Sequence, residues 1–270
     1  MSIQKNALYQ DLKDCNLIIE VRDIRLPVTT AVPLLKAKFG SKARALFFTK
    51  ADLVSEGQRQ KVLTWGRSQG LYCAAVNISD KQALKRHLTQ AASHCVTQKS
   101  LLGILRVGII GLPNVGKSSM INIFRGKNVV KVANRPGVTK GRQWIRISDN
   151  MVMLDTPGIA TIAYKKSLHK ENFLKLAACR ILADSEYEML EVAEYCYQKL
   201  KENTSITLPE ELKEVLDRHL EFSDLLASIS IRQNFKKVGG VPDIERASRY
   251  FCEQCHLHVL PFVDMDLLPT

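Results

Sequence analysis

The sequence has no apolar run long enough to cross a lipid bilayer. A spanning helix needs about 20 consecutive apolar residues, whereas the best stretch, residues 101–111, is short and interrupted by Arg106. The first residues also lack the apolar core of a secretory signal, and acidic residues at positions 11, 14, 20 and 23 argue against an organellar transit peptide. We therefore expect a cytoplasmic protein with no membrane span.

Cysteines show no spacing typical of a disulfide framework. There are seven, at positions 15, 73, 95, 179, 196, 252 and 255, which indicates a reducing compartment. The stretch Cys252-Glu-Gln-Cys255-His256 has the letters of a haem-attachment motif and of half a zinc site. Haem attachment needs export and zinc needs a fourth ligand, so a helix end with two small apolar side chains is the preferred interpretation.

Acidic residues are also scarce relative to basic ones. The 27 Asp and Glu against 39 Lys and Arg give a net charge of +12, which favours a polyanionic partner such as nucleic acid, although a basic solvated surface alone could produce it. The excess is confined to the first part of the chain, because residues 1–170 carry +19 and residues 171–270 carry −7.

Short apolar runs alternate with longer polar stretches in that basic part. Strands are predicted at residues 17–21, 45–48, 71–76, 105–110 and 151–154, and helices at 55–70, 80–96 and 117–125. The alternation predicts an α/β fold with a mostly parallel sheet and helices on both faces. Later in the chain only helical spacing remains, near residues 171–183, 186–202, 209–227 and 241–256, with Pro209 and Pro242 at expected first turns. We predict an α/β domain over residues 1–168 and a smaller all-helical domain over residues 169–270.

A phosphate-binding motif follows the strand predicted at residues 105–110. Gly111-Leu-Pro-Asn-Val-Gly116-Lys117-Ser118-Ser119 matches the pattern G-x-x-x-x-G-K-[ST]. Its glycines let backbone N–H groups point at a β-phosphate, Lys117 neutralises phosphate charge and the Ser118 hydroxyl can hold Mg²⁺. The strand-loop-helix context argues against an ordinary glycine-rich turn. The nucleotide-binding residues predicted here are Asn114, Val115, Gly116, Lys117, Ser118 and Ser119.

A second motif, Asp155-Thr-Pro-Gly158, ends the strand predicted at residues 151–154. Asp155 can reach Mg²⁺ through water, and the Gly158 N–H can approach a γ-phosphate. Alone the tetrapeptide is equally a good turn sequence, but its position 38 residues after Lys117 favours a γ-phosphate sensor. Between the two motifs, Thr139 can complete the Mg²⁺ shell. The predicted metal ligands are therefore Ser118, Thr139 and Asp155, and the predicted catalytic groups are Lys117, Thr139 and Gly158.

A third motif, Thr49-Lys50-Ala51-Asp52, lies upstream of both. The Asp52 carboxylate can accept hydrogen bonds from guanine N1–H and N2–H₂, a pair of donors that adenine lacks, and the Lys50 stem can lie over the base. A lone tetrapeptide of this kind is more often a helix start or a loop, so its weight comes from the other two motifs.

Together these motifs resemble those of TRAFAC-type GTPases, in the order base motif, phosphate loop and Asp-Thr-Pro-Gly. That order is typical of circularly permuted GTPases, and within them the chain resembles the YlqF/RbgA group of ribosome-assembly GTPases over nearly its whole length. The stretches that support the resemblance, beside the motifs, are Glu20-Val-Arg-Asp-Ile-Arg-Leu-Pro27, Pro136-Gly-Val-Thr-Lys-Gly141 and Lys237-Val-Gly-Gly-Val-Pro-Asp-Ile-Glu-Arg246.

The resemblance implies a P-loop GTPase domain followed by a helical domain. It implies binding of GTP and GDP with Mg²⁺, GTP hydrolysis, and action late in maturation on the large ribosomal subunit precursor and its rRNA. Asn114 matches the position associated with a K⁺ ion in related GTPases, and its alternative role is to satisfy a turn. We also expect a monomer.

Three departures from the family pattern bear on activity. Thr49 stands where the base motif usually has Asn, as in Rho-like GTPases, so guanine preference is expected to survive. The fifth motif has only the candidate Asn77-Ile-Ser79, which loop polarity explains equally well. The Trp-Phe-Pro-Gly-His-Met segment with which the family usually begins has no counterpart in the opening Met-Ser-Ile-Gln-Lys-Asn.

The absence of this last segment, which carries the family's proposed catalytic His, predicts slow intrinsic hydrolysis. Ile159 stands where Ras-like enzymes have the Gln that orients the attacking water, and an aliphatic side chain cannot do this. The polar group must come from a lost upstream segment, from the loop around Lys140 or from ribosomal RNA, so stimulation by ribosomal particles is expected. The alternative is a GTP-dependent RNA- or ribosome-binding adaptor with little or no hydrolysis; a P-loop kinase would leave the base motif without a purpose.

Basic residues are concentrated between the phosphate-binding motif and Asp155-Thr-Pro-Gly158. This segment should reorganise when GTP binds. Phosphate contacts from this segment would make RNA affinity depend on both salt and nucleotide. The predicted RNA contacts are Lys127, Lys131, Arg135, Lys140, Arg142 and Arg146.

Overall fold

The computed structural model describes residues 12–32, 39, 41–95, 103–125, 143–155, 168–202, 213–214 and 221–258, and the structural statements below refer to them. They fall into two compact units that divide between residues 166 and 167, whereas the predicted domain boundary lies between residues 168 and 169. Each unit is described by itself. No helix within these described ranges is long and apolar enough to cross a membrane.

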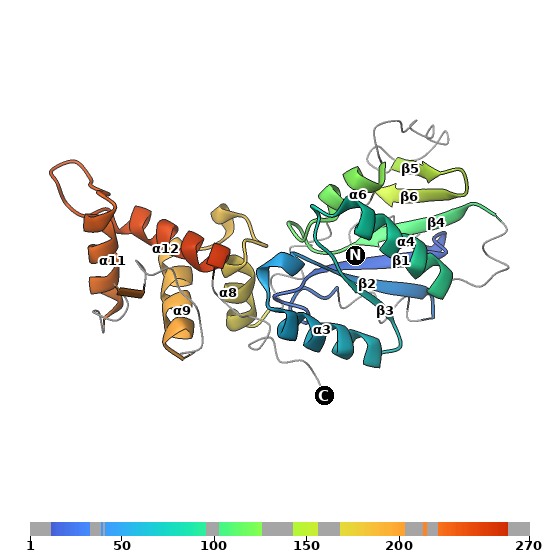
Figure 1. Ribbon diagram of the computed structural model, residues 1–270. Helices are drawn as coiled ribbons and strands as arrows, with labels where there is room; N and C mark the ends of the chain where they lie inside the picture. The colour runs from blue at the N-terminus through green and yellow to red at the C-terminus, as the bar shows by residue number, and fades with distance from the viewer. Residues whose placement is uncertain are drawn as a thin grey trace. The chain divides into compact units, whose positions relative to one another are not determined.

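The first unit is built on a six-stranded sheet with the order β3-β2-β1-β4-β6-β5. Neighbouring strands are parallel except β5, which runs antiparallel to β6 at one edge (Figure 1). The strands are β1 Leu17–Asp23, β2 Ala43–Thr49, β3 Tyr72–Ala75, β4 Leu105–Ile110, β5 Gln143–Ser148 and β6 Met151–Asp155. The mostly parallel sheet expected from the sequence is confirmed. No strand is predicted at β5, because the exposed Arg146 interrupts its apolar pattern.

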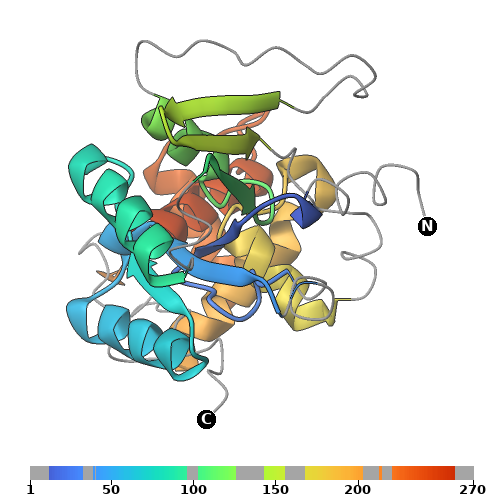
Figure 2. The same ribbon diagram turned by 90° about the vertical axis from the view of Figure 1, so that its right-hand side faces the viewer.

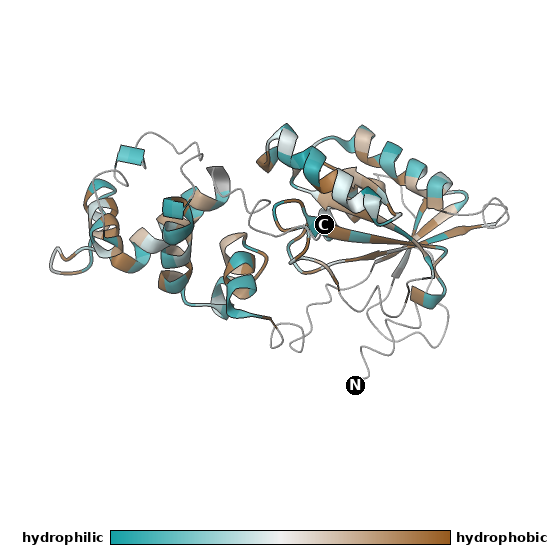
Figure 3. Cartoon of the chain, turned by 90° about the horizontal axis from the view of Figure 1, so that it is seen from below, coloured by the Kyte–Doolittle hydropathy of each residue, from teal (hydrophilic) through white to brown (hydrophobic). Residues whose placement is uncertain are grey.

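Helices cover both faces of this sheet, as expected for parallel strands. α3 Glu56–Ser68 and α4 Lys81–Cys95 pack on opposite sides of β3 (Figure 2), and α6 Lys117–Arg125 lies beside α4. α3 begins at a capping box in which Ser55 and Gln58 each bond the other's backbone N–H. In Figure 3 the strands are mostly hydrophobic, whereas the helices alternate between hydrophilic and hydrophobic positions.

The central strand β1 is buried along its whole length because it lies between β2 and β4. A cluster of apolar side chains on β1, β4 and β6 and on the segments beside them closes one part of the core. Its members are Leu12, Cys15, Ile18, Val32, Phe39, Ile110 and Leu154, with Trp144 packed against them. These contacts join β1, β4 and β6 in one apolar core.

The second unit is helical. Its elements are α8 Lys170–Ala178, the short 3-10 helix η2 Asp184–Glu186, α9 Met189–Glu202, α11 Phe222–Arg232 and α12 Ile244–His258. α12 packs against both α9 and α11. The all-helical character predicted for this region is confirmed in its described residues.

Two helix boundaries differ from the prediction. A single helix over residues 209–227 is wrong, because Glu221 has extended backbone angles and α11 begins after it; Pro209 lies outside the described residues. Pro242 does not occupy the first turn of α12 but pairs with Lys236 in an isolated β-bridge. The helix begins at Ile244 instead, and the carboxylate of the preceding Asp243 accepts a hydrogen bond from the Arg246 N–H at 3.1 Å.

Cys252 and Cys255 lie on α12 and are buried in the helical core. The Cys196 thiol, on α9, hydrogen-bonds with both. The hydrogen bond to Cys196 and burial raise the pKa of the Cys252 thiol, so this thiol stays protonated at neutral pH. The two cysteines therefore pack as small apolar side chains between α9 and α12.

Candidate functional site

The phosphate-binding motif forms the turn between β4 and α6, and its glycines are required by close approaches. A Cβ atom on Gly111 would lie 2.4 Å from the backbone oxygen of Val21 in β1. Gly116 has a φ of 94°, and its Cβ would lie 2.9 Å from the Ile78 side chain. Asn114 also has a left-handed φ, of 55°. The loop thus curls tightly against β1 and against the segment that follows β3, as a phosphate cradle must.

Lys117 is the first residue of α6, and its side chain is buried. Its Nζ donates a hydrogen bond to the Leu112 carbonyl on the opposite side of the loop. Ser118, Ser119 and Asn114 are exposed. The loop therefore combines a cation, hydroxyl groups and the N–H groups of a helix start, which together suit a phosphate chain.

The base motif begins at the end of β2, and Thr49 joins it to the phosphate loop. Thr49 is fully buried, and its Oγ1 lies 2.7 Å from the Val115 carbonyl oxygen and 3.1 Å from that of Arg22. This role cannot be predicted from the sequence, in which Thr49 is notable only because the base motif usually has Asn at its position. The hydroxyl instead links the ends of β1 and β2 to the phosphate loop.

Lys50 and Asp52 follow Thr49 with different surroundings. Lys50 has left-handed backbone angles, φ 59° and ψ 35°, and precedes the single-turn 3-10 helix η1 Ala51–Leu53. Asp52 lies in η1 and is exposed. Its carboxylate makes no hydrogen bond or ion pair with other residues in the described part of the chain, so it is open to a ligand's donors.

The candidate fifth motif lies against the phosphate loop. The Ile78 side chain would lie 2.9 Å from a Cβ atom on Gly116. The Asn77 carboxamide oxygen accepts hydrogen bonds from the Ser79 N–H at 2.9 Å and hydroxyl at 2.8 Å. The segment follows β3, whose neighbour is β2. Proximity to the base motif and to the phosphate loop therefore supports this segment as the fifth motif, which the polarity of the loop sequence alone could not do.

Several predicted residues are brought to one edge of the sheet. The base motif follows β2, the phosphate loop follows β4, and Asp155 ends β6, the parallel neighbour of β4. Arg146 is exposed on β5, where its Nη2 donates to the Asp149 carbonyl at 3.2 Å. The remaining predicted site residues, Thr139, Gly158, Lys127, Lys131, Arg135, Lys140 and Arg142, lie outside the described residues.

A network of buried charges at the end of β1 is absent from the predicted site. Asp23 is fully buried and accepts from Arg25 at 3.0 Å to Oδ1 and 2.8 Å to Oδ2, while Lys50 Nζ lies 2.8 Å from Oδ2. Burial by itself raises the pKa of Asp23, but the charges and hydrogen bonds of Arg25 and Lys50 outweigh it and hold that pKa well below its usual range. The signal in the sequence is a set of charges that ends an otherwise apolar strand.

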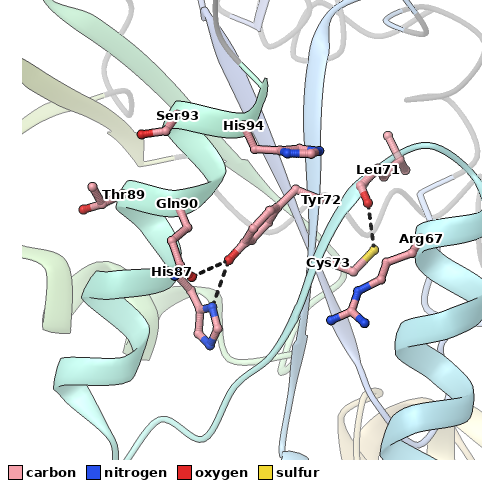
Figure 4. A pocket seen from close by; sticks show the side chains of 9 residues that line it. All are labelled: Arg67, Leu71, Tyr72, Cys73, His87, Thr89, Gln90, Ser93 and His94. Carbon is pink, nitrogen blue, oxygen red and sulfur yellow. Dashed lines mark hydrogen bonds between the residues drawn. The ribbon is translucent and has the colours of Figure 1, made fainter.

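A pocket of about 730 Å³ lies beside β3, at its amino-terminal end (Figure 4). The Tyr72 hydroxyl is 2.9 Å from His87 Nδ1 and 2.9 Å from Gln90 Oε1. Burial lowers the pKa of His87. The base and phosphate motifs follow the opposite ends of the strands, so this pocket is not part of the candidate site. Its lining residues are Arg67, Leu71, Tyr72, Cys73, His87, Thr89, Gln90, Ser93 and His94.

Comparisons with known sequences point in the same direction as the geometry. Residues 106–220 match the family model described as 50S ribosome-binding GTPase. Ribosome biogenesis GTPase A of Bacillus cereus is 30% identical over 234 residues, which cover 80% of this chain and 78% of that protein. The protein of the same name from Thermotoga maritima is 28% identical over 247 residues, covering 92% and 84%.

Solved structures show the same fold. GNP-bound YlqF from T. maritima has a TM-score of 0.67 at 24% identity and covers 94% of this chain and 95% of that chain. A GDP-bound YlqF structure has a TM-score of 0.68, also at 24% identity, and covers 93% and 96%. The likeness therefore extends over both units.

Proposed function

We infer the function of this chain from the ribosome biogenesis GTPase A family, to which it belongs. We propose that the protein binds GTP, hydrolyses it to GDP and phosphate, and acts in assembly of the large ribosomal subunit. The observation that carries the proposal is the meeting of base motif and phosphate loop through the Thr49 hydroxyl, 2.7 Å from the Val115 carbonyl oxygen. A fixed distance between these motifs suits a ligand with a base at one end and phosphates at the other.

The residues of the phosphate loop divide the work of binding. Backbone N–H groups of Val115, Gly116 and the start of α6 donate to the β-phosphate, and the Lys117 ammonium neutralises the β- and γ-phosphates. Lys117 Nζ is held by the Leu112 carbonyl across the loop. The ammonium is therefore directed across the phosphate cradle before a nucleotide arrives.

The donor atoms of the site fit Mg²⁺, because hydroxyl and carboxylate oxygens are the ligands that this ion prefers. Ser118 offers an exposed hydroxyl at the start of α6, and we assign it, with Thr139 and Asp155, as ligands. Held by these oxygens, Mg²⁺ would offset the negative charge of the phosphates. The exposed, left-handed Asn114 is the residue proposed for K⁺.

The base end of the site selects guanine. The exposed carboxylate of Asp52 accepts from the two guanine donors, and the Lys50 stem lies over the ring. Ser79 and Asn77 form a tight turn beside the phosphate loop, which suits the fifth motif. Selectivity over adenine follows because adenine would leave a carboxylate oxygen without a donor.

Hydrolysis is proposed to be slow in the isolated protein and faster on ribosomal particles. Gly158 and Thr139 contact the γ-phosphate, but Ile159 cannot orient the attacking water. The missing polar group is supplied by the ribosomal particle or by the loop around Lys140. Turnover measured with and without large subunits and K⁺ tests this; fast turnover by the isolated protein would contradict it.

The basic segment of the first unit is proposed to contact rRNA when GTP is bound. Residues 1–170 carry a net charge of +19, and phosphate contacts of lysine and arginine weaken steeply with salt. Among the proposed contacts, Arg146 has an exposed side chain on the edge strand β5. The protein is proposed to be cytoplasmic and monomeric.

The rival function is a GTP-dependent ribosome-binding adaptor that hydrolyses little or nothing. It is favoured by one observation, the aliphatic Ile159 at the position that orients water in Ras-like enzymes. GTP affinity with no stimulation of turnover by large subunits would support the adaptor.

Substitution Asp52→Asn tests the base assignment. An amide presents a donor as well as an acceptor, so GTP affinity should fall by about 10- to 100-fold, as for loss of a hydrogen bond to a charged group, while XTP affinity rises. Competition against a fluorescent GDP measures both. Asp14→Asn, at an exposed carboxylate away from the motifs, should change neither affinity, and unchanged selectivity in Asp52→Asn would remove the base assignment.

A further inference from the structure

Lys50 is held in an unusual position by the fold. It is a non-glycine residue in the left-handed region, with φ 59°. It directly follows the buried end of β2, and its side chain is 22% exposed. A lysine in this place would ordinarily extend its ammonium into solvent. Instead, Nζ lies 2.8 Å from Oδ2 of Asp23, so the stem is directed along the edge of the sheet.

Asp23 is held in place by contacts that do not involve Lys50. It is the last residue of β1 and pairs in register with Thr49 of β2, so its carboxylate lies beside the base motif. Arg25 holds Oδ1 by its Nε and its backbone N–H, both at 3.0 Å, and Oδ2 by Nη2 at 2.8 Å. The Asp23 carboxylate is fully buried and accepts from three donors of Arg25, so its position is fixed. Pairing with it restricts the Lys50 side chain to one direction.

The second buried carboxylate of β1 has no such connection. Glu20 Oε1 accepts from Arg22 Nε at 2.9 Å and from the Val32 N–H at 2.8 Å. Neither bond involves residues 49–52. Both carboxylates thus lie on β1, are buried and pair with an arginine of their own. Only Asp23 contacts the base motif.

We propose that Asp23 is a positioning residue for guanine, which preorganises Lys50 so that its stem already lies where the base will pack. The inference rests on the proposed nucleotide site, and it assigns part of the base affinity to a residue outside residues 49–52. A free lysine side chain loses rotamer freedom when it is ordered by a ligand, and an anchor that orders it beforehand removes that loss from binding.

The test compares Asp23→Asn with Glu20→Gln, each measured against the unsubstituted chain. Asp23→Asn removes the charge that anchors Lys50, and we expect the dissociation constants of GTP and GDP to rise equally, by about 5- to 10-fold. The effect is equal because the two nucleotides share the base. Glu20→Gln loses a comparable buried charge and serves as the control for stability alone. Affinities are taken per folded molecule, from titration of binding-competent protein, with turnover at saturating GTP expected to stay unchanged.

Lys50→Met keeps an apolar stem for the base but cannot pair with Asp23, so it tests the same anchor if Asp23→Asn does not fold. It should weaken GTP and GDP by the same factor as Asp23→Asn, and the double variant should be no weaker than Lys50→Met alone. Equal loss in Glu20→Gln, independent losses in the double variant, or binding by Lys50→Met within about twofold of the unsubstituted chain would overturn the inference.

The same series contains Asp52→Asn, which separates the two proposals. A shift of Asp52→Asn towards XTP together with an unaffected Asp23→Asn would overturn only the positioning role. Unchanged selectivity in Asp52→Asn would overturn the base site and the positioning role together.

Discussion

Thr49→Val is the substitution that most directly probes the link between the base motif and the phosphate loop. Valine has nearly the shape of threonine, so the fully buried site loses a hydroxyl without a large change in volume. The hydrogen bond from Oγ1 to the Val115 carbonyl at 2.7 Å disappears, as does the contact at 3.1 Å to the Arg22 carbonyl. The phosphate loop then keeps its glycines but loses a tether to β2.

The expected magnitude follows from one shared proton. A hydroxyl has a single hydrogen, so the two carbonyl oxygens count as one bond, and removing the donor from a buried acceptor costs about 1–3 kcal/mol. Because the loop carries the phosphate-binding N–H groups, part of this loss should also appear as weaker GDP binding, by about 3- to 10-fold. The remainder should appear as a lower free energy of unfolding.

Urea unfolding and titration with fluorescent GDP measure the two effects separately. Thr49→Ser keeps the hydroxyl and loses only the methyl group, so it should bind GDP more tightly than Thr49→Val. Thr64→Val makes the same chemical change at an exposed position on α3 and should alter neither quantity. If Thr49→Val bound GDP as tightly as the unsubstituted protein while Thr49→Ser bound it more weakly, the tether would have no role in the site.

Three further outcomes are expected. Gly111→Ala should lower the free energy of unfolding by about 1–3 kcal/mol or more, because its Cβ would lie 2.4 Å from a backbone oxygen, whereas Gly103→Ala, with nothing within 4 Å, should be near neutral in the same urea assay. Asp23→Asn should lower the free energy of unfolding by about 3–5 kcal/mol at pH 7. Because the folded-state pKa of Asp23 is lowered, the ionised carboxylate stabilises the fold above the unfolded pKa of about 3.9, and this stabilisation is lost as pH falls below that value. The free energies of unfolding of the variant and the unsubstituted protein should therefore converge in acid. Lys140→Glu should weaken sedimentation with large ribosomal subunits more than Lys213→Glu in the acidic helical unit, and equal effects would argue against a contact in the basic segment.

The motifs could be predicted from the sequence because each is local. The spacing from Gly111 to Ser118 and the strand before it determine a turn at a helix start, whatever the rest of the chain does. The alternation of apolar runs likewise determined a parallel α/β sheet, and the absence of such runs after residue 170 determined a helical unit. Edge strand β5 and the start of α11 escaped prediction, because an exposed arginine and a change of backbone angles at Glu221 carry no periodic signal.

What only the tertiary structure decided is which local pieces meet. Thr49 and Val115 are 66 residues apart, yet their atoms lie 2.7 Å apart because β2 and β4 end at the same edge on either side of β1. The same adjacency turned Asp23 from one charge in a family-like stretch into the anchor of Lys50. Spacing along the chain determines local hydrogen bonds and periodicity, whereas contacts between strand ends depend on the order of strands in the sheet, which burial of the whole core selects.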